Sequence, residues 1–224
     1  MLVINSEQKP EYLERVAALI GRYPGCGLYS MGFEVHRPEG VFPNETVMQE
    51  GIVGNYFRTA MRVNLTQTSS VTIPRAVFER LGGFPEGMKL GEDQYVWTKI
   101  ARTYPVCYSP QRFSEFNLMA QNRSAQNYKM ERTPYSFWEF YDPGTPDCNE
   151  YVARCEIGKA LVHSVYGYTD AALEVERRYS YNRHYRLGWW KLRILNRLPV
   201  MWRRPLLDSY KRVTWLVSKK GLLG

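Results

Sequence analysis

The sequence has no long apolar run. None of its stretches approaches the roughly 18 consecutive apolar residues that a membrane-spanning helix needs. The opening segment 1–4 is also too short for the apolar region of a signal peptide. We therefore expect a cytoplasmic protein, and the 44% hydrophobic and 14% aromatic content of its 224 residues predicts a globular chain with a substantial core.

Metal-binding side chains are scarce. The four cysteines form no Cys-x-x-Cys pair and the three histidines stand far apart, so the spacing does not favour a structural zinc site. Only five aspartates occur, and no two of them are separated by a single residue. The chain therefore contains no Asp-x-Asp motif, and we assign no residue to a metal.

Acidic residues are almost absent from the last part of the chain. Residues 177–224 hold 13 Lys and Arg against one acid, Asp208, together with four of the six tryptophans. Their net charge of +12 leaves −4 for the first 176 residues. Basic helices interleaved with Trp and Leu suit the headgroup region of an anionic membrane, so we predict that 177–224 binds such a surface at the inner face of the membrane.

Two other interpretations of this basic segment stay open. Lys and Arg stems often cover an ordinary helical extension whose tryptophans lie in its core. Nucleic-acid binding is less favoured, because a phosphate-binding surface alone does not need so many large aliphatic side chains.

Periodicity predicts an α/β first part and an α-helical second part, which we divide as 1–127 and 128–224. Apolar residues at helical spacing predict helices over the following segments: 10–22, 74–81, a helix opening at the acids 92–93, 148–167 and 169–182. Alternating or β-branched segments predict strands at 27–35, 65–73, 106–108 and 112–118. An Asp147-x-x-Glu150 capping box is expected to open the fourth helix, and the turn 142–144 is expected to mark the join.

Two adjacent carboxylates, Glu92 and Asp93, are the strongest candidates for chemistry. They follow the glycine-broken loop 82–91 and precede an amphipathic helix, so they should project from its first turn. A carboxylate in this position can act as a general base towards a substrate hydroxyl. The alternative is structural, because acids in a first turn also stabilise a helix by about 0.3–1 kcal/mol.

Several segments in a fixed order resemble the acceptor-side half of family 2 glycosyltransferases, which are inverting enzymes with a GT-A fold. The similar segments are Thr68-Ser69-Ser70-Val71, Pro74-Arg75, Leu81-Gly82-Gly83-Phe84-Pro85-Glu86 and Gly91-Glu92-Asp93-Gln94-Tyr95-Val96-Trp97. Residues 9–13 and 23–24 resemble the segment that follows the Asp-x-Asp motif in that family. The likeness spans about residues 7–125.

The resemblance implies a role for each of five residues. Asp93 looks like the base that removes a proton from the acceptor hydroxyl, and Glu92 looks like its orienting neighbour. Thr68, Ser69 and Trp97 are similar to positions near the acceptor and donor sugars. The implied substrates are a nucleotide sugar and a glycan or lipid-linked acceptor, and the complete family enzyme is expected to use a divalent cation, Mg²⁺ or Mn²⁺.

One departure from the family shapes the expected fold. The nucleotide-binding strands and the Asp-x-Asp motif should precede residue 7, and this sequence does not contain them. We therefore expect a partial GT-A (Rossmann-like) domain lacking the N-terminal nucleotide-binding strands, followed by an α-helical basic region, and we expect the chain to be a fragment of a longer transferase. The alternatives are a noncatalytic carbohydrate- or membrane-binding module and a basic-tail protein that touches nucleic acid.

Overall fold

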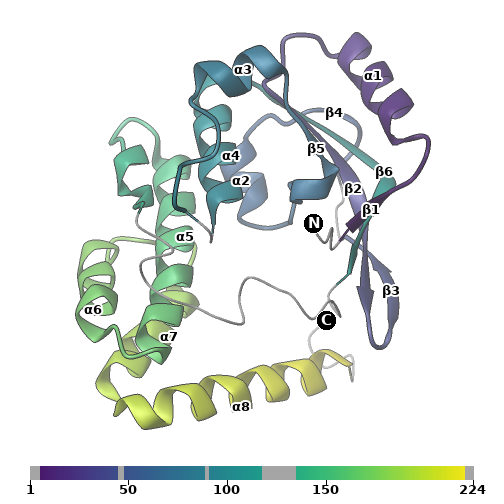
Figure 1. The fold of residues 1–224 in the computed structure, drawn as a ribbon. Coiled ribbons are helices and arrows are strands. Elements are labelled where there is room, and N and C mark those ends of the chain that lie inside the picture. Colours follow the sequence, from purple (N-terminus) through teal and green to yellow (C-terminus); the bar gives the residue numbers. More distant parts are fainter. Residues whose placement is uncertain (1–5, 45–47, 89–90, 118–134, 220–224) are drawn as a thin grey trace. The chain divides into compact units, whose positions relative to one another are not determined.

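The computed structural model describes residues 6–44, 48–88, 91–117 and 135–219 (Figure 1). Its contacts divide the chain into two compact units, residues 1–151 and 152–224. The first unit is mixed α/β and is built on a curled mixed sheet, whereas the described part of the second contains helices. The expectation of an α/β part followed by a helical region is therefore confirmed.

Two long parallel strands form the centre of the sheet. They are β2 (Leu28–Arg37) and β6 (Val106–Asn117), paired from Leu28 opposite Val106 to His36 opposite Asn117. Short antiparallel strands pair with the outer edge of each long strand. Beside β6 lie β1 (Ser6–Gln8) and β4 (Gly51–Ile52). Beside β2 lie β3 (Gly40–Pro43) and β5 (Val71–Thr72). The sheet thus has a parallel core with short antiparallel strands along both sides.

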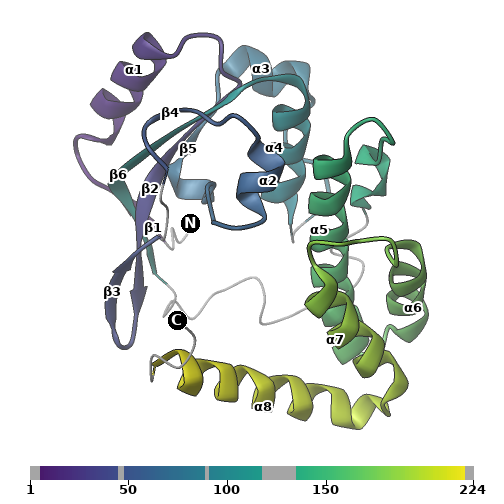
Figure 2. The same cartoon turned by 180° about the vertical axis from the view of Figure 1, so that it is seen from behind.

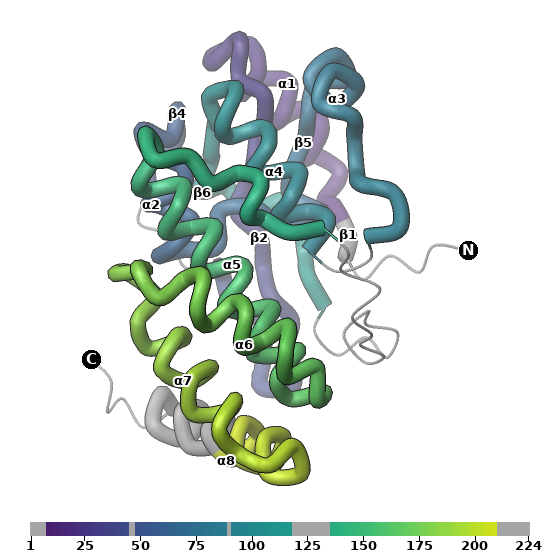
Figure 3. The backbone as a smooth tube through the Cα atoms, turned by 90° about the vertical axis from the view of Figure 1, so that its left-hand side faces the viewer, coloured from purple at the N-terminus to yellow at the C-terminus, as the bar shows by residue number. Residues whose placement is uncertain are grey.

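Helices cover both faces of this parallel pair. Leu28, Val106 and Tyr108 pack with α4 (Glu92–Thr103) on one face. Successive side chains of a strand point to opposite faces, so Tyr29 and Cys107, which follow Leu28 and Val106, point to the other face. There they pack with α1 (Tyr12–Arg22). Figure 1 shows α4 and α1 on opposite sides of the sheet, and Figure 3 views the sheet from the α4 side. Because both faces are covered, the first residues of β2 and β6 are buried without alternation.

The predicted strand over 65–73 is wrong for most of its length. Residues Thr68–Ser70 form a 3₁₀ turn, η1, and only the two residues of β5 pair with β2. The Ser70 hydroxyl donates to the Gln67 carbonyl at 2.9 Å and accepts from the Gln67 N–H at 3.3 Å. Short polar side chains that bond the local backbone in this way compete with sheet formation.

The two strands predicted over 106–118 form the single strand β6 as far as Asn117, and Leu118 lies outside the described residues. Pro110 sits inside this strand at an irregularity, where the register shifts between Met31 and Phe33. Gly32 makes the close approach possible, because a Cβ there would lie 2.7 Å from the Pro110 carbonyl oxygen. Proline is tolerated in a sheet at such a bulge.

The predicted helices of the first unit are confirmed with small shifts at their ends, as α1, α3 (Arg75–Arg80) and α4. The segment 41–60, for which the sequence pattern predicts a mixture of loop and helix, includes β4 and a short helix, α2 (Tyr56–Ala60), capped by the Asn55 side chain. A 3₁₀ turn, η4 (Phe137–Phe140), precedes α5.

The long helix α5 (Pro146–Val165) begins in the first unit and continues into the second. Its predicted capping box is wrong in detail, because Asp147 already lies inside the helix and its carboxylate accepts from Asn55 at 2.7 Å and Arg58 at 3.1 Å. Asp147 therefore joins α5 to α2 and does not stand at the N-cap position of α5.

The second unit holds the rest of α5 together with α6 (Thr169–Arg178), α7 (Arg186–Arg197) and α8 (Val200–Lys219). Figure 2 shows α6 beside α7. Ile157, Ala172, Tyr179, Trp189 and Leu192 are each at most 5% exposed. Among the described residues, no helix combines the length and apolar character needed to cross a bilayer.

A buried carboxylate links α6 to α7. Glu176 is 5% exposed, and its oxygens accept from the Arg197 guanidinium at 2.8 and 3.0 Å and from Asn196 Nδ2 at 2.9 Å. Burial by itself raises the pKa of this carboxyl, but the hydrogen bonds from Arg197 and Asn196 outweigh burial and hold the pKa below its ordinary value. Glu176 is therefore expected to be ionised in the folded protein at neutral pH.

The second unit is expected to lose stability in acid because of Glu176. A carboxyl whose pKa is lowered by folding stabilises the fold above its unfolded pKa of about 4.3, and that stability disappears as the pH falls through the folded pKa. Thermal unfolding between pH 7 and about pH 3 measures the effect. Glu176→Gln cannot ionise, so its melting temperature should fall less steeply with acid, and an identical slope in both proteins would contradict the assignment.

Candidate functional site

The candidate site lies where the glycine-rich loop meets the start of α4. Helix α3 ends at Arg80, and Gly82 and Gly83 follow it; the Gly83 N–H donates to the Phe78 carbonyl at 3.0 Å. At the other end of the loop, Gly91 precedes α4 with φ of +77°, in the left-handed region. The predicted order of short helix, glycine loop, carboxylates and helix is observed, and it places Glu92 and Asp93 in the first turn.

Asp93 has its carboxylate fixed by two donors. The Thr68 hydroxyl donates to Oδ2 at 3.1 Å, and the backbone N–H of Gln94 donates to Oδ1 at 2.7 Å. Asp93 is partly buried. The structure therefore brings together two of the predicted site residues, Thr68 and Asp93, which are 25 positions apart and come from η1 and α4.

Ser69 and Glu92 lie next to this pair in the chain. The Ser69 carbonyl accepts a hydrogen bond from the Gln8 side chain at 2.8 Å, which fastens η1 to β1. Glu92 is the first residue of α4 and is partly buried. Ser69 and Glu92 are thus the chain neighbours of the two residues that bond to each other, Thr68 and Asp93.

Trp97 is in the core. It is 2% exposed and packs among the residues between α4 and the sheet, with the Phe84 ring 6.2 Å from its own. The Trp97 indole N–H is buried and has no hydrogen-bond partner among the described residues. This burial favours a packing role for Trp97, in which it anchors the loop through Phe84, over the predicted contact with a sugar.

Replacing Gly91 by Ala is expected to destabilise the start of α4 by about 1–2 kcal/mol, because an L side chain is strained at a left-handed backbone position. Urea unfolding measures the loss. Gly158 lies inside α5, where a Cβ would meet nothing within 4 Å, so Gly158→Ala should stabilise the protein by up to about 1 kcal/mol. Equal effects of the two substitutions would contradict the strain at Gly91.

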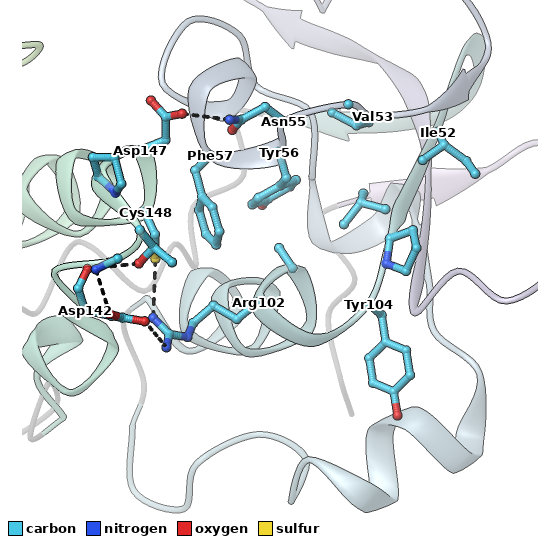
Figure 4. Close-up of a pocket in the computed structure, with 17 residues that line it drawn as sticks. Ile52, Val53, Asn55, Tyr56, Phe57, Arg102, Tyr104, Asp142, Asp147 and Cys148 are labelled. Carbon is cyan, nitrogen blue, oxygen red and sulfur yellow. Dashed lines mark hydrogen bonds and ion pairs between the residues drawn. The ribbon is translucent and has the colours of Figure 1, made fainter.

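A separate pocket lies at the opposite end of α4 (Figure 4). It measures about 730 Å³ and is lined by β4, α2, the end of α4 and the loop before α5. Its polar groups are already engaged with one another: Arg102 donates to the Phe140 carbonyl and to Cys148 Sγ at 3.7 Å and lies 3.9 Å from Asp142. Asp147 is held by Asn55 and Arg58 in the same way.

The chemistry of this pocket is limited by those pairings. Burial, partly offset by Arg102, raises the pKa of Cys148, so its sulfur is a thiol and a poor nucleophile at neutral pH. Sequence reasoning missed the pocket. The turn at Asp142 was visible in the sequence, but no local signal connects it with Arg102 on α4.

The described residues do not fit a metal centre. Within the described ranges, no group of three His, Cys, Asp or Glu side chains gathers closely enough to bind an ion. The divalent cation implied by the family resemblance therefore has no ligand set in this part of the chain.

Comparison with known proteins found no match to this chain among protein-family models, curated proteins or solved structures.

Proposed function

We propose that the chain is a family 2-like glycosyltransferase, in which Asp93 removes a proton from the acceptor hydroxyl during transfer from a nucleotide sugar with inversion. The observation that carries this proposal is the pairing of Thr68 with Asp93 at 3.1 Å, because the resemblance assigns both residues to one site. On this proposal, residues 1–127 correspond to the acceptor-side half of a GT-A domain.

The fold supports this assignment at the level of architecture. A parallel strand pair, β2 and β6, is covered on one face by α4 and on the other by α1. Helix α4 leads directly into β6, so its first turn lies one helix length from the start of that strand. Parallel sheets with helices on both faces are the framework of nucleotide-dependent α/β enzymes.

The proposed reaction needs a carboxylate of fixed orientation. As the acceptor oxygen forms its bond to the anomeric carbon, the bond from that carbon to the diphosphate oxygen breaks, and the acceptor proton passes to Asp93. The nucleoside diphosphate leaves with the bonding electrons. Two donors that hold both oxygens of Asp93 restrict its rotation, which is the preorganisation that general-base catalysis requires.

The test is turnover. The chain is incubated with UDP- and GDP-sugars and with glycan or lipid-linked acceptors, and release of nucleoside diphosphate is measured together with the anomeric configuration of the product. Inverted product supports the proposal. No nucleotide release with any donor, or a product of retained configuration, contradicts it for this chain.

A second function has one observation in its favour. Both oxygens of Asp93 already accept hydrogen bonds, as they would in a residue that only stabilises the start of α4. This favours the alternative of a noncatalytic carbohydrate-binding module. Calorimetric titration with glycans and with nucleotide sugars distinguishes the two, because the module binds a glycan and has no affinity for a nucleotide sugar.

A further inference from the structure

We propose that the exposed face of α7 docks on the surface of an anionic membrane, with the helix lying parallel to the lipid plane. This goes beyond the proposed transferase chemistry and does not depend on it, because the residues concerned lie in the second unit, away from Asp93 in the chain.

Three large apolar side chains form a stripe on this face. Leu187, Trp190 and Ile194 follow one another at spacings of three and four residues, so they share one side of α7. They are 78%, 47% and 54% exposed. The opposite side of the helix already supplies the core, through Trp189, Leu192 and Leu195, which are each at most 5% exposed. The core of the second unit therefore does not use the side chains of the stripe.

Cations border the stripe on both sides. Helix α7 has four Lys and Arg and no acid. At 3.6 residues per turn, Arg186, Arg193 and Arg197 run along one border of the stripe and Lys191 lies along the other. Arg193 stacks over the Trp190 ring at 5.2 Å, and Arg197 is engaged with Glu176. Apolar side chains between basic ones match a bilayer interface, whose acyl boundary takes the former and whose anionic headgroups take the latter.

The first turns of α8 extend the same chemistry. Met201 and Trp202 are 77% and 63% exposed, and the neighbouring Arg204 is exposed as well. The buried Arg203 fixes this turn, because its guanidinium donates to the Ser164 and Leu198 carbonyls at 2.9 Å each. An anchored turn presents its exposed Trp at low entropic cost, and Trp is favoured at membrane–water interfaces.

Charge complementarity selects the membrane over other occupants of the face. A second copy of this chain would bring the same four cations of α7 against each other. Nucleic acid would use the cations but leave Leu187 and Ile194 exposed. A phospholipid surface with anionic headgroups satisfies both kinds of side chain at once.

The experiment is vesicle flotation of the full chain, with phosphatidylcholine vesicles and with vesicles that also contain phosphatidylglycerol. We expect binding to the mixed vesicles, weakened by salt, and little binding to phosphatidylcholine alone. The variant Leu187→Ser/Trp190→Ser/Ile194→Ser should bind about 100-fold more weakly. The double variant Lys191→Gln/Arg204→Gln should bind mixed vesicles about fivefold more weakly for each cation removed. Its binding to neutral vesicles should change much less.

A matched variant controls for the loss of exposed apolar area. Leu13, Val41 and Ile52 are 71%, 54% and 53% exposed in the first unit, so Leu13→Ser/Val41→Thr/Ile52→Thr removes a similar surface elsewhere. This control should bind vesicles like the parent, and circular dichroism should show that both triple variants fold.

Three results would overturn the proposal. One is equal vesicle binding by the parent and the α7 variant. Another is absence of vesicle binding together with strongly salt-dependent DNA binding. The third is a parent protein that is dimeric in solution and does not bind vesicles, together with an α7 variant that is monomeric.

Discussion

Asp93→Asn is expected to lower the rate of sugar transfer by about 10²–10⁴-fold, the usual contribution of a general base. The substitution keeps the shape of the side chain and one acceptor oxygen, so a hydrogen bond from Thr68 or Gln94 can persist. It removes the negative charge that takes up the acceptor proton. Stability should fall by no more than about 1 kcal/mol, which is the first-turn contribution of a carboxylate.

Asp170→Asn is the matched control for this prediction. Asp170 lies in the first turn of α6, so its replacement removes a first-turn carboxylate of the same kind in the other unit. Rates of nucleoside diphosphate release and melting temperatures are compared for the two variants. If Asp93→Asn and Asp170→Asn keep equal activity, Asp93 is a helix-start residue and the noncatalytic alternative stands.

Arg203→Met is expected to cost the second unit about 3 kcal/mol or more, the largest loss of stability predicted here. Arg203 is 3% exposed, and its guanidinium donates to three carbonyls, those of Ser164, Asn196 and Leu198, and to the Thr169 hydroxyl. These acceptors come from the ends of α5 and α7 and the start of α6. Methionine has a similar volume to arginine, so the loss of stability arises mainly from buried acceptors that are left without a donor. Each such acceptor costs about 1–3 kcal/mol.

The neighbouring position supplies the control. Arg204 is exposed, so Arg204→Met should change stability by less than about 0.5 kcal/mol. Urea unfolding followed by tryptophan fluorescence measures both variants. Arg203→Lys should fall between them, because an ammonium cannot reproduce the forked geometry of a guanidinium. Equal midpoints for Arg203→Met and Arg204→Met would show that the carbonyls find other donors.

The sequence was most informative where a pattern reports directly on packing. Helices α1, α3 and α4 could be predicted because apolar side chains recur on one face of each helix, after a Pro or an acid at its start. The strand over 65–73 failed because Ser70 bonds its local backbone, an effect that alternation does not register. The single strand β6 was missed because the Gly32 approach that accommodates Pro110 comes from a partner strand far away in sequence.

The candidate site divides in the same way. Asp93 and Thr68 were predicted to share a site on the strength of the family resemblance, since no local periodicity relates residues 25 positions apart. Trp97 was harder to place, because an aromatic on an amphipathic helix suits either a core or a sugar platform. The pocket at Arg102 depends on tertiary contacts with Phe140 and Cys148, which the sequence does not encode locally.

The short strands beside β2 and β6 limit how this sheet can meet other polypeptides. Each of β1, β3, β4 and β5 has between two and four residues. Because they pair with the outer edges of β2 and β6, an incoming strand finds only short segments of backbone with which to pair. Binding of a partner by addition of a β-strand is therefore disfavoured, as is the strand-by-strand stacking of copies that forms fibrils. A partner of this unit is expected to recognise side chains.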